Sequence, residues 1–127
     1  MAKATVESQQ NLRQEVRIRH HRLAGDEAPE IGGEDTAPNP HEFLLAALGT
    51  CTSMTLLVYA RRKGFQLEKV VVELEDTREG AVTQIRRDIH LEGPLTDEQR
   101  QRLIEIAAKC PVHRTLTGEI RVADRLV

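Results

Sequence analysis

Residues 36–64 read TAPNPHEFLLAALGTCTSMTLLVYARRKG, and this stretch decides the fold. Asn39 is a good helix N-cap, and Pro40 suits the first position of a helix. At the other end, three basic residues precede Gly64, which can adopt the left-handed conformation that ends many helices. These signals predict one helix from about Pro40 to Lys63, roughly 35 Å long at ~1.5 Å per residue.

No residue between Glu42 and Arg61 is charged. A helix that is apolar on all sides is buried either in a protein core or in a membrane. The uncharged run reaches the usual length of a membrane span, roughly 18 residues. However, Gly49 and four hydroxyl side chains make its middle polar, and these are Thr50, Thr52, Ser53 and Thr55. We therefore expect a central core helix and no membrane association.

Cys51 lies in the middle of the predicted helix. Burial in an apolar stripe raises the pKa of a thiol and leaves it inert. The helix dipole gives little help, because it acts within the first turn. Any reactivity of Cys51 therefore needs a cation from another part of the structure. Residues three, four and seven positions away share its helix face, and these are Leu44, Ala47, Leu48, Met54, Thr55 and Val58.

Length and composition indicate one domain over residues 1–127, which can bury roughly two thirds of its unfolded surface. A net charge of −2 and three aromatic residues argue against nucleic-acid binding. The N-terminus, MAKATVESQQ, has no apolar run that could serve as a signal peptide. Two cysteines do not make a secreted disulfide scaffold. We therefore expect a cytoplasmic protein.

The N-terminal region is predicted to form two strands, Ala2–Glu7 and Leu12–Leu23, joined around residues 9–11. In the second strand Arg13, Arg17 and Arg19 share one face with acidic and histidine side chains. This basic row is either a solvated strand face or the source of a cation for a buried thiolate. The acidic connector 25–38 is either a linker or the wall of a pocket.

After the central helix, alternating residues predict a hairpin of strands Lys69–Thr77 and Val82–Leu91. Thr96 and Gln99 form a capping box for a second helix that runs to the region of Pro111. A short turn over 113–116 then leads to a last strand, Glu119–Val122. The second helix places Cys110 on its apolar face, so the two cysteines could meet across the core.

Other interpretations of the cysteines stay open on these grounds. Both can be ordinary small hydrophobic residues. Cys110 and His113 also offer one C-x-x-H half of a zinc site, but structural zinc usually needs a second pair, and none is spaced for it. We expect no metal and no cofactor.

Two blocks of the chain, residues 26–64 and 95–116, resemble the osmotically inducible protein C and organic hydroperoxide resistance family (OsmC/Ohr). The block N-P-x-E before Cys51 and the C-P-V-x sequence at Cys110 carry the resemblance. The amino-acid sequence of the two blocks is most similar to the OsmC-like branch of the family. The resemblance implies an α+β, OsmC-like fold with an N-terminal hairpin, a long buried central helix, a second hairpin, a second helix and a C-terminal strand. It also implies an intertwined homodimer with active sites at the subunit interface.

The activity implied by the resemblance is thiol-dependent reduction of organic hydroperoxides. Cys51 matches the peroxidatic cysteine and Cys110 the resolving cysteine, which together form a disulfide that a dithiol reductant, such as a lipoyl group, reduces. In the family an N-terminal arginine holds the thiolate, and a glutamate at the start of the central helix pairs with it. Here the arginine candidates are Arg13 and Arg17. The glutamate candidate is Glu42.

The glutamate marks a departure from the family pattern. Its usual position holds His41 in this chain, and Glu42 follows one residue later. One residue turns a helical side chain by about 100°. This keeps a second hypothesis open, a non-catalytic OsmC-like module that binds a small apolar or thiol-reactive ligand. Consumption of peroxide in the presence of a dithiol separates the two hypotheses.

Overall fold

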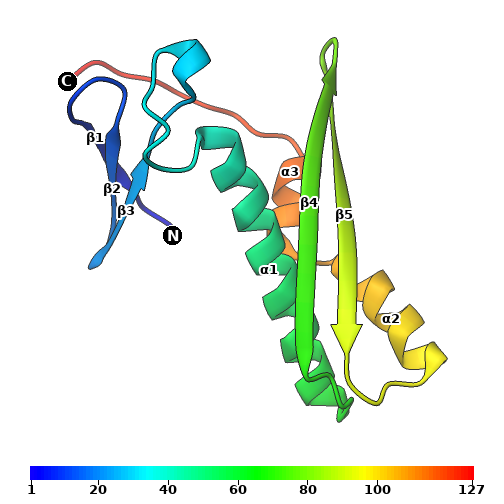
Figure 1. The fold of residues 1–127 in the computed structure, drawn as a ribbon. Coiled ribbons are helices and arrows are strands. Elements are labelled where there is room, and N and C mark those ends of the chain that lie inside the picture. The colour runs from blue at the N-terminus through cyan, green and yellow to red at the C-terminus, as the bar shows by residue number, and fades with distance from the viewer. The chain divides into compact units, whose positions relative to one another are not determined.

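A computed structural model describes all residues from 1 to 127, and it is an α+β structure, as predicted (Figure 1). The strands are β1 (Thr5–Ser8), β2 (Gln14–Ile18), β3 (His21–Gly25), β4 (Lys69–Glu79) and β5 (Val82–Glu92). The helices are the short 3-10 helix η1 (Pro29–Ile31), then α1 (Pro40–Lys63), α2 (Asp97–Ala107) and α3 (Pro111–Thr117). The chain divides into two compact units, Met1–Leu44 and Leu45–Val127. That residues 1–127 act as one domain stays a prediction.

The first unit contains a three-stranded antiparallel sheet in the order β1-β2-β3. The predicted two-stranded hairpin is wrong here, because the segment Leu12–Leu23 folds back on itself at Arg19 and His20. Arg19 has a positive φ of 55°, which a tight hairpin turn requires and which glycine or asparagine usually supplies. Arg19 therefore lies in a turn and not on the strand face predicted for it.

The predicted bounds of α1, Pro40–Lys63, are confirmed. Asn39 and Glu42 cap the helix reciprocally: the Asn39 side chain accepts from the Glu42 N–H at 2.9 Å, and the Glu42 carboxylate accepts from the Asn39 N–H at 2.9 Å. Gly64 ends the helix with a φ of 71°. Local signals alone therefore fix both ends of this helix.

The hydrophobic core of the second unit lies between α1, α2 and the inner face of the β4–β5 hairpin, which Figure 1 shows side by side. Both hairpin strands alternate as predicted, and Val70, Ile89 and Leu91 turn inward. Gly49 allows a close approach, since a Cβ atom there would lie 2.7 Å from Leu74 Cδ1. The buried centre of this core consists of Leu56, Ala60, Leu103, Ile106 and Ala107.

In the single chain α1 is buried on one side only, and its burial on all sides by a partner subunit stays a prediction. Opposite the buried stripe, the Met54 side chain is 61% exposed and Val58 is 42% exposed. The helix is long and apolar enough to cross a membrane, with a mean hydropathy of 1.7. Its buried stripe contributes to the core, and a core helix has the same composition. The buried residues of α1 are Leu48, Gly49, Thr52, Leu56 and Ala60.

The last part of the chain differs from the prediction. The capping box of Thr96 and Gln99 is confirmed, but α2 ends at Ala107, before Cys110. Residues Pro111–Thr117 form α3 in place of the predicted turn, because proline suits the first position of a helix. The predicted strand Glu119–Val122 is wrong: residues 119–127 have no regular structure and are exposed, and neither sheet includes them.

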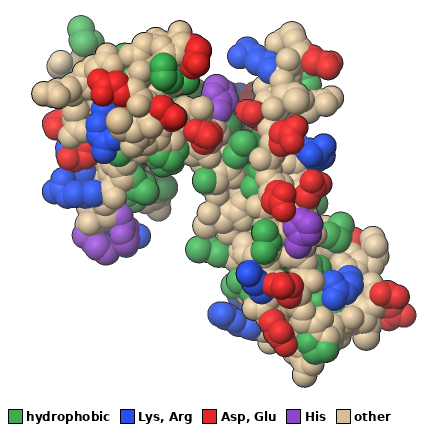
Figure 2. All heavy atoms as spheres, viewed as in Figure 1, with side chains coloured by type: hydrophobic (Ala, Val, Ile, Leu, Met, Phe, Trp, Pro, Cys, Tyr) green, Lys and Arg blue, Asp and Glu red, His purple; other side chains and the backbone are tan.

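Charges of both signs share the surface. Figure 2 shows acidic and basic side chains interspersed on the viewed face. On the outer face of the β4–β5 hairpin, Arg86 pairs with Glu75 at 3.2 Å, and His90 lies 3.3 Å from Glu73. Exposed pairs of this kind contribute only about 0–1 kcal/mol each, so they mark a solvated face more than a source of stability.

Candidate dithiol site

The structure brings Cys51 and Cys110 together. Cys51 comes from the middle of α1 and is half-buried, whereas Cys110 is fully buried. Both are free thiols, and they lie close enough for a hydrogen bond between them to shift the pKa of each. Two neighbouring reduced thiols are candidates for oxidation to a disulfide.

Cys110 caps the helix that follows it. The sequence places it near the end of α2, but in the structure it is the N-cap of α3, and its sulfur accepts from the His113 N–H at 3.4 Å. Pro111 occupies the next position, so the segment between the two helices turns sharply at the cysteine. The backbone N–H groups of α3 therefore face the sulfur pair.

The two thiols differ in acidity. Burial raises the pKa of the Cys51 thiol, and its hydrogen bond to Cys110 raises it further. Burial also acts to raise the pKa of Cys110, but hydrogen bonds from Cys51 and from the His113 and Val112 N–H groups lower it. Because the two thiols interact, they lose their protons as a coupled pair, and their surroundings favour the first loss from Cys110.

The two thiols also differ in access to solvent. Cys51 lies at the border between the buried stripe of α1 and its exposed apolar side, which includes Met54 and Val58. Cys110 has no exposed surface. A molecule arriving from solution reaches Cys51 first, and it reaches Cys110 only through Cys51 or after a local opening.

Arg87 is a neighbour of the cysteines that the sequence reasoning missed. It belongs to the inward row of β5 and is half-buried. Its guanidinium donates to Thr52 Oγ1 at 2.8 Å, to the Ala107 carbonyl oxygen at 3.4 Å and to His113 Nδ1 at 3.2 Å. A signal was present in the sequence, since an arginine between the inward-facing Ile85 and Ile89 interrupts an apolar row.

The spacing of Cys110 and His113 offers half of a zinc site. Nowhere in the chain do three His, Cys, Asp or Glu side chains gather closely enough to hold a metal ion. Since a guanidinium has no acceptor, His113 Nδ1 accepts the hydrogen bond from Arg87. The cysteine sulfur in turn accepts from the His113 backbone and from Cys51.

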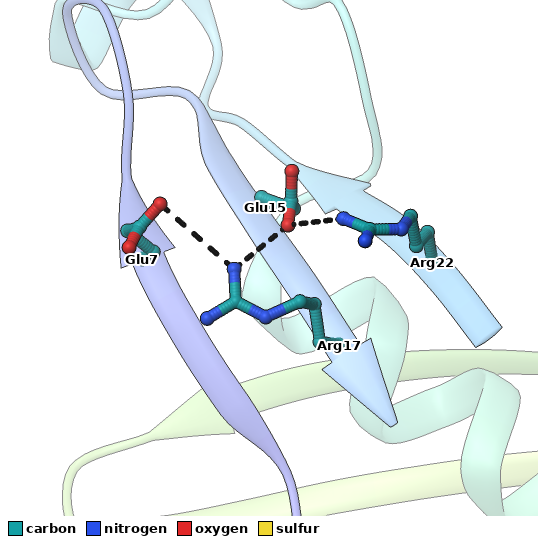
Figure 3. Close-up of polar contacts among 4 residues, drawn as sticks. All are labelled: Glu7, Glu15, Arg17 and Arg22. Carbon is teal, nitrogen blue, oxygen red and sulfur yellow. Dashed lines mark hydrogen bonds and ion pairs between the residues drawn. The ribbon is translucent and has the colours of Figure 1, made fainter. Parts of the chain in front are cut away.

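Arg17, a predicted partner of the thiolate, is held by carboxylates of its own sheet. It lies 2.8 Å from Glu15 and 3.8 Å from Glu7, and Arg22 shares the same Glu15 oxygen at 2.8 Å (Figure 3). The hydrogen bond from Arg17 lowers the pKa of Glu15. In this arrangement the charge of Arg17 is compensated within the sheet.

The other two predicted residues also have partners within the first unit. Arg13 donates to the Thr36 hydroxyl at 2.7 Å and to the Thr36 carbonyl oxygen at 3.2 Å. Glu42 is occupied by the capping box with Asn39, and His41 is exposed. The roles expected of Arg13, Arg17 and Glu42 at the thiolate stay predictions.

Comparisons with known proteins agree with this fold. The OsmC-like protein family matches residues 32–123. An uncharacterized protein of Haloferax volcanii is 29% identical over 94 residues, which cover 69% of this chain and 70% of the relative. The solved structure of an OsmC-like protein from Mycoplasma pneumoniae has a TM-score of 0.77 at 18% identity and covers 93% of this chain and 88% of its own.

A second solved structure is that of an organic hydroperoxide resistance protein, OsmC, from Legionella pneumophila. It has a TM-score of 0.72 at 21% identity and covers 93% of this chain and 90% of its own. At these identities the solved structures show the fold alone. The family match covers well over half of the sequence and includes Cys51 and Cys110. The chain therefore belongs to the OsmC-like protein family.

Proposed function

We propose that this protein is a thiol-dependent peroxidase that reduces organic hydroperoxides through a Cys51 sulfenic acid and a Cys51–Cys110 disulfide. One observation carries the proposal: a half-buried thiol at the edge of an exposed apolar row contacts a second thiol that is fully buried. The first is accessible to a peroxide, and the second is placed to resolve the oxidised product. The Legionella relative, named for organic hydroperoxide resistance, supports this choice of substrate.

The chemistry starts from the pair with one proton. As the Cys51 sulfur attacks the terminal peroxide oxygen, its proton passes to the Cys110 thiolate. The O–O bond breaks, Cys51 becomes a sulfenic acid, and the alkoxide takes the proton from Cys110 and leaves as an alcohol. The Cys110 thiolate then attacks the Cys51 sulfur, forms the disulfide and releases hydroxide. The two sulfurs lose two electrons to the peroxide, and a dithiol reductant restores them.

The acidity of Cys110 serves both steps. A thiolate beside Cys51 accepts the proton that the attacking sulfur must lose, and it is itself the nucleophile for the sulfenic acid. Burial keeps Cys110 away from peroxide in solution, since its exposed fraction is 0%. The mechanism thus assigns attack to the accessible sulfur and resolution to the buried one.

The remaining parts of the proposal concern the surroundings of the site. The exposed apolar side of α1, with Met54 and Val58, suits a peroxide that carries a hydrocarbon chain. We assign to Arg13 or Arg17 a cation that favours loss of the proton from Cys51 during the attack, and to Glu42 the orientation of that arginine. For Arg17 this requires its guanidinium to leave Glu15 for the Cys51 sulfur. The proposed setting is a cytoplasmic homodimer served by a dithiol such as a lipoyl group.

Replacement of each cysteine tests the order of the two steps. We expect Cys51→Ser to abolish peroxide reduction. We expect Cys110→Ser to consume one equivalent of an organic hydroperoxide, to leave a sulfenic acid that a dimedone-type probe captures at Cys51, and to overoxidise with excess peroxide. Intact-mass spectrometry after one equivalent of peroxide, followed by steady-state turnover with a dithiol, measures each outcome.

The opposite pattern reverses the assignment: if Cys51→Ser still reacts while Cys110→Ser is inert, Cys110 is the attacking residue. If the unchanged protein neither forms the disulfide nor consumes peroxide, the proposed peroxidase activity is refuted. The second hypothesis, a non-catalytic module that binds a small apolar or thiol-reactive ligand, then takes its place.

A further inference from the structure

We propose that Arg87 is a positioning residue of the dithiol site, which fastens the segment that carries Cys110 to the turn of α1 that carries Cys51. This inference deepens the proposed function and rests on one part of it, the formation of a disulfide between Cys51 and Cys110. It arises from the three hydrogen bonds of one guanidinium, whose acceptors come from three different helices.

The acceptors of Arg87 surround both cysteines along the chain. Thr52 directly follows Cys51. Ala107 precedes Cys110 by three residues, and His113 follows it by three. A single side chain therefore holds both ends of the segment 107–113 and the residue next to the partner cysteine.

Each acceptor is available to Arg87 for a physical reason. The Thr52 hydroxyl donates its proton to the Leu48 carbonyl at 2.7 Å, so the oxygen lone pairs are free to accept. Ala107 is the last residue of α2, and its carbonyl oxygen, which also accepts from the Cys110 N–H at 3.3 Å, has a second lone pair for Arg87. The His113 ring supplies Nδ1. Thr52 and Ala107 are both buried, which protects these hydrogen bonds from exchange with water.

The charge of Arg87 sets it apart from the other arginines of the hairpin. No carboxylate lies within ion-pair distance of its guanidinium, whereas the adjacent Arg86 points outward and pairs with Glu75 and Asp88. Arginine is suited to a site of this kind because its planar fork presents several donors in fixed directions. A half-buried charge without a carboxylate partner requires such a set of acceptors. The neighbourhood of Arg87 fits a role in holding the site together.

The test measures how strongly the two cysteines are held together, without using peroxide. The reduced protein is equilibrated in mixtures of reduced and oxidised dithiothreitol, and the Cys51–Cys110 disulfide is quantified by mass spectrometry after alkylation. We expect Arg87→Met to need a mixture roughly 10- to 100-fold more oxidising than the unchanged protein, because misplaced groups lose effective concentration on that scale. Arg87→Lys keeps the positive charge but lacks the forked guanidinium. Its disulfide is expected to form in a mixture between those needed by the unchanged protein and by Arg87→Met.

The matched control is Arg86→Met, which removes an arginine from the neighbouring position on the outer face of the same strand. It is expected to leave the disulfide equilibrium unchanged. A second variant, His113→Ala, removes one acceptor while keeping the backbone N–H that contacts Cys110. It is expected to shift the disulfide equilibrium in the same direction as Arg87→Met. The double variant, Arg87→Met with His113→Ala, is expected to shift it no further than Arg87→Met alone, because the Arg87–His113 hydrogen bond is already lost.

The outcomes separate this inference from the proposed function. Equal equilibria for the unchanged protein, Arg87→Met and His113→Ala would overturn the positioning role and leave peroxide reduction untouched. Additive effects of Arg87→Met and His113→Ala would overturn the contact as its cause. Conversely, a protein that forms the disulfide in dithiothreitol and depends on Arg87, but consumes no peroxide, keeps the inference and refutes the proposed activity.

Discussion

Asp26 is a buried carboxylate whose charge is met by hydrogen bonds and not by a cation. Its side chain is 4% exposed. It accepts from the Thr36 hydroxyl, from the Thr36 N–H at 3.0 Å and from the Glu27 N–H at 2.8 Å. These bonds, the one from the Thr36 hydroxyl above all, lower the pKa of Asp26 to about 2. The acidic connector, which the sequence leaves open as linker or pocket wall, is thus fastened around one aspartate.

The acid dependence of stability tests this role. The folded pKa of about 2 lies below the ordinary value of 3.8, so the stabilisation is complete above the ordinary value. It is lost as the pH falls from about 4 to about 2. We expect Asp26→Asn to be less stable than the unchanged protein near neutral pH. We also expect its free energy of unfolding to fall less steeply between about pH 4 and pH 2, because the one carboxyl that takes up a proton there is gone. Chemical denaturation from pH 6 to about 2 measures it. Glu30→Gln, an exposed change in η1, serves as the control, and an unchanged pH profile for Asp26→Asn would contradict the assignment.

Single residues also show what sequence patterns can and cannot identify. Cys51 and Cys110 were predicted because thiols are few and the family motif includes them. Arg87 was not, because its partners lie 35, 20 and 26 residues away in the chain. An inward charge in an apolar strand indicates that some partner exists, but not which one.

At the scale of elements, local signals were reliable where the chain supplies its own hydrogen-bond partners. The N-cap at Asn39 and the capping box of Thr96 and Gln99 were correctly predicted, since each uses groups within four residues. The reciprocal bond from Glu42 to the Asn39 N–H was not predicted. The turn at Arg19 was missed because no glycine, asparagine or proline marks it. The strand over 119–122 was wrong because an alternating pattern needs a neighbouring strand to pair with, and the structure provides none.

Gly93 gives a prediction about the connection between β5 and α2. Its φ is 138°, and a Cβ atom there would overlap the carbonyl oxygen of Gln66. We expect Gly93→Ala to lower the free energy of unfolding by at least about 3 kcal/mol, because strained backbone and overlap act together. Gly80 is a matched control, with a φ of 59° and open space around it. Gly80→Ala should cost only about 1–2 kcal/mol. Urea unfolding measures the free energy of unfolding of both variants. An equal decrease for Gly93→Ala and Gly80→Ala would contradict the prediction, because it would show that the overlap with Gln66 adds no cost.

At the scale of the whole molecule, the exposed side of α1 predicts a homodimer. Leu44, Met54 and Val58 are each at least 40% exposed on a helix that has no charged residue from Phe43 to Ala60. A row of this kind usually lies at an interface. We expect light scattering at micromolar concentration to give about twice the chain mass of 14.3 kDa. Met54→Glu should shift the protein toward monomer, whereas Met54→Leu should not. A mass of 14.3 kDa for the unchanged protein would refute the dimer.

The sequence by itself determined the α+β class, both ends of α1, the alternating rows of the β4–β5 hairpin and the capping box of α2. Each rests on interactions within a few residues or on a periodicity that the chain carries along its own length. Only the tertiary structure decided that Cys51 is accessible while Cys110 is buried, and that Arg87 joins their two segments. These features depend on contacts between residues far apart in the chain, which fold-level packing selects and no local pattern encodes.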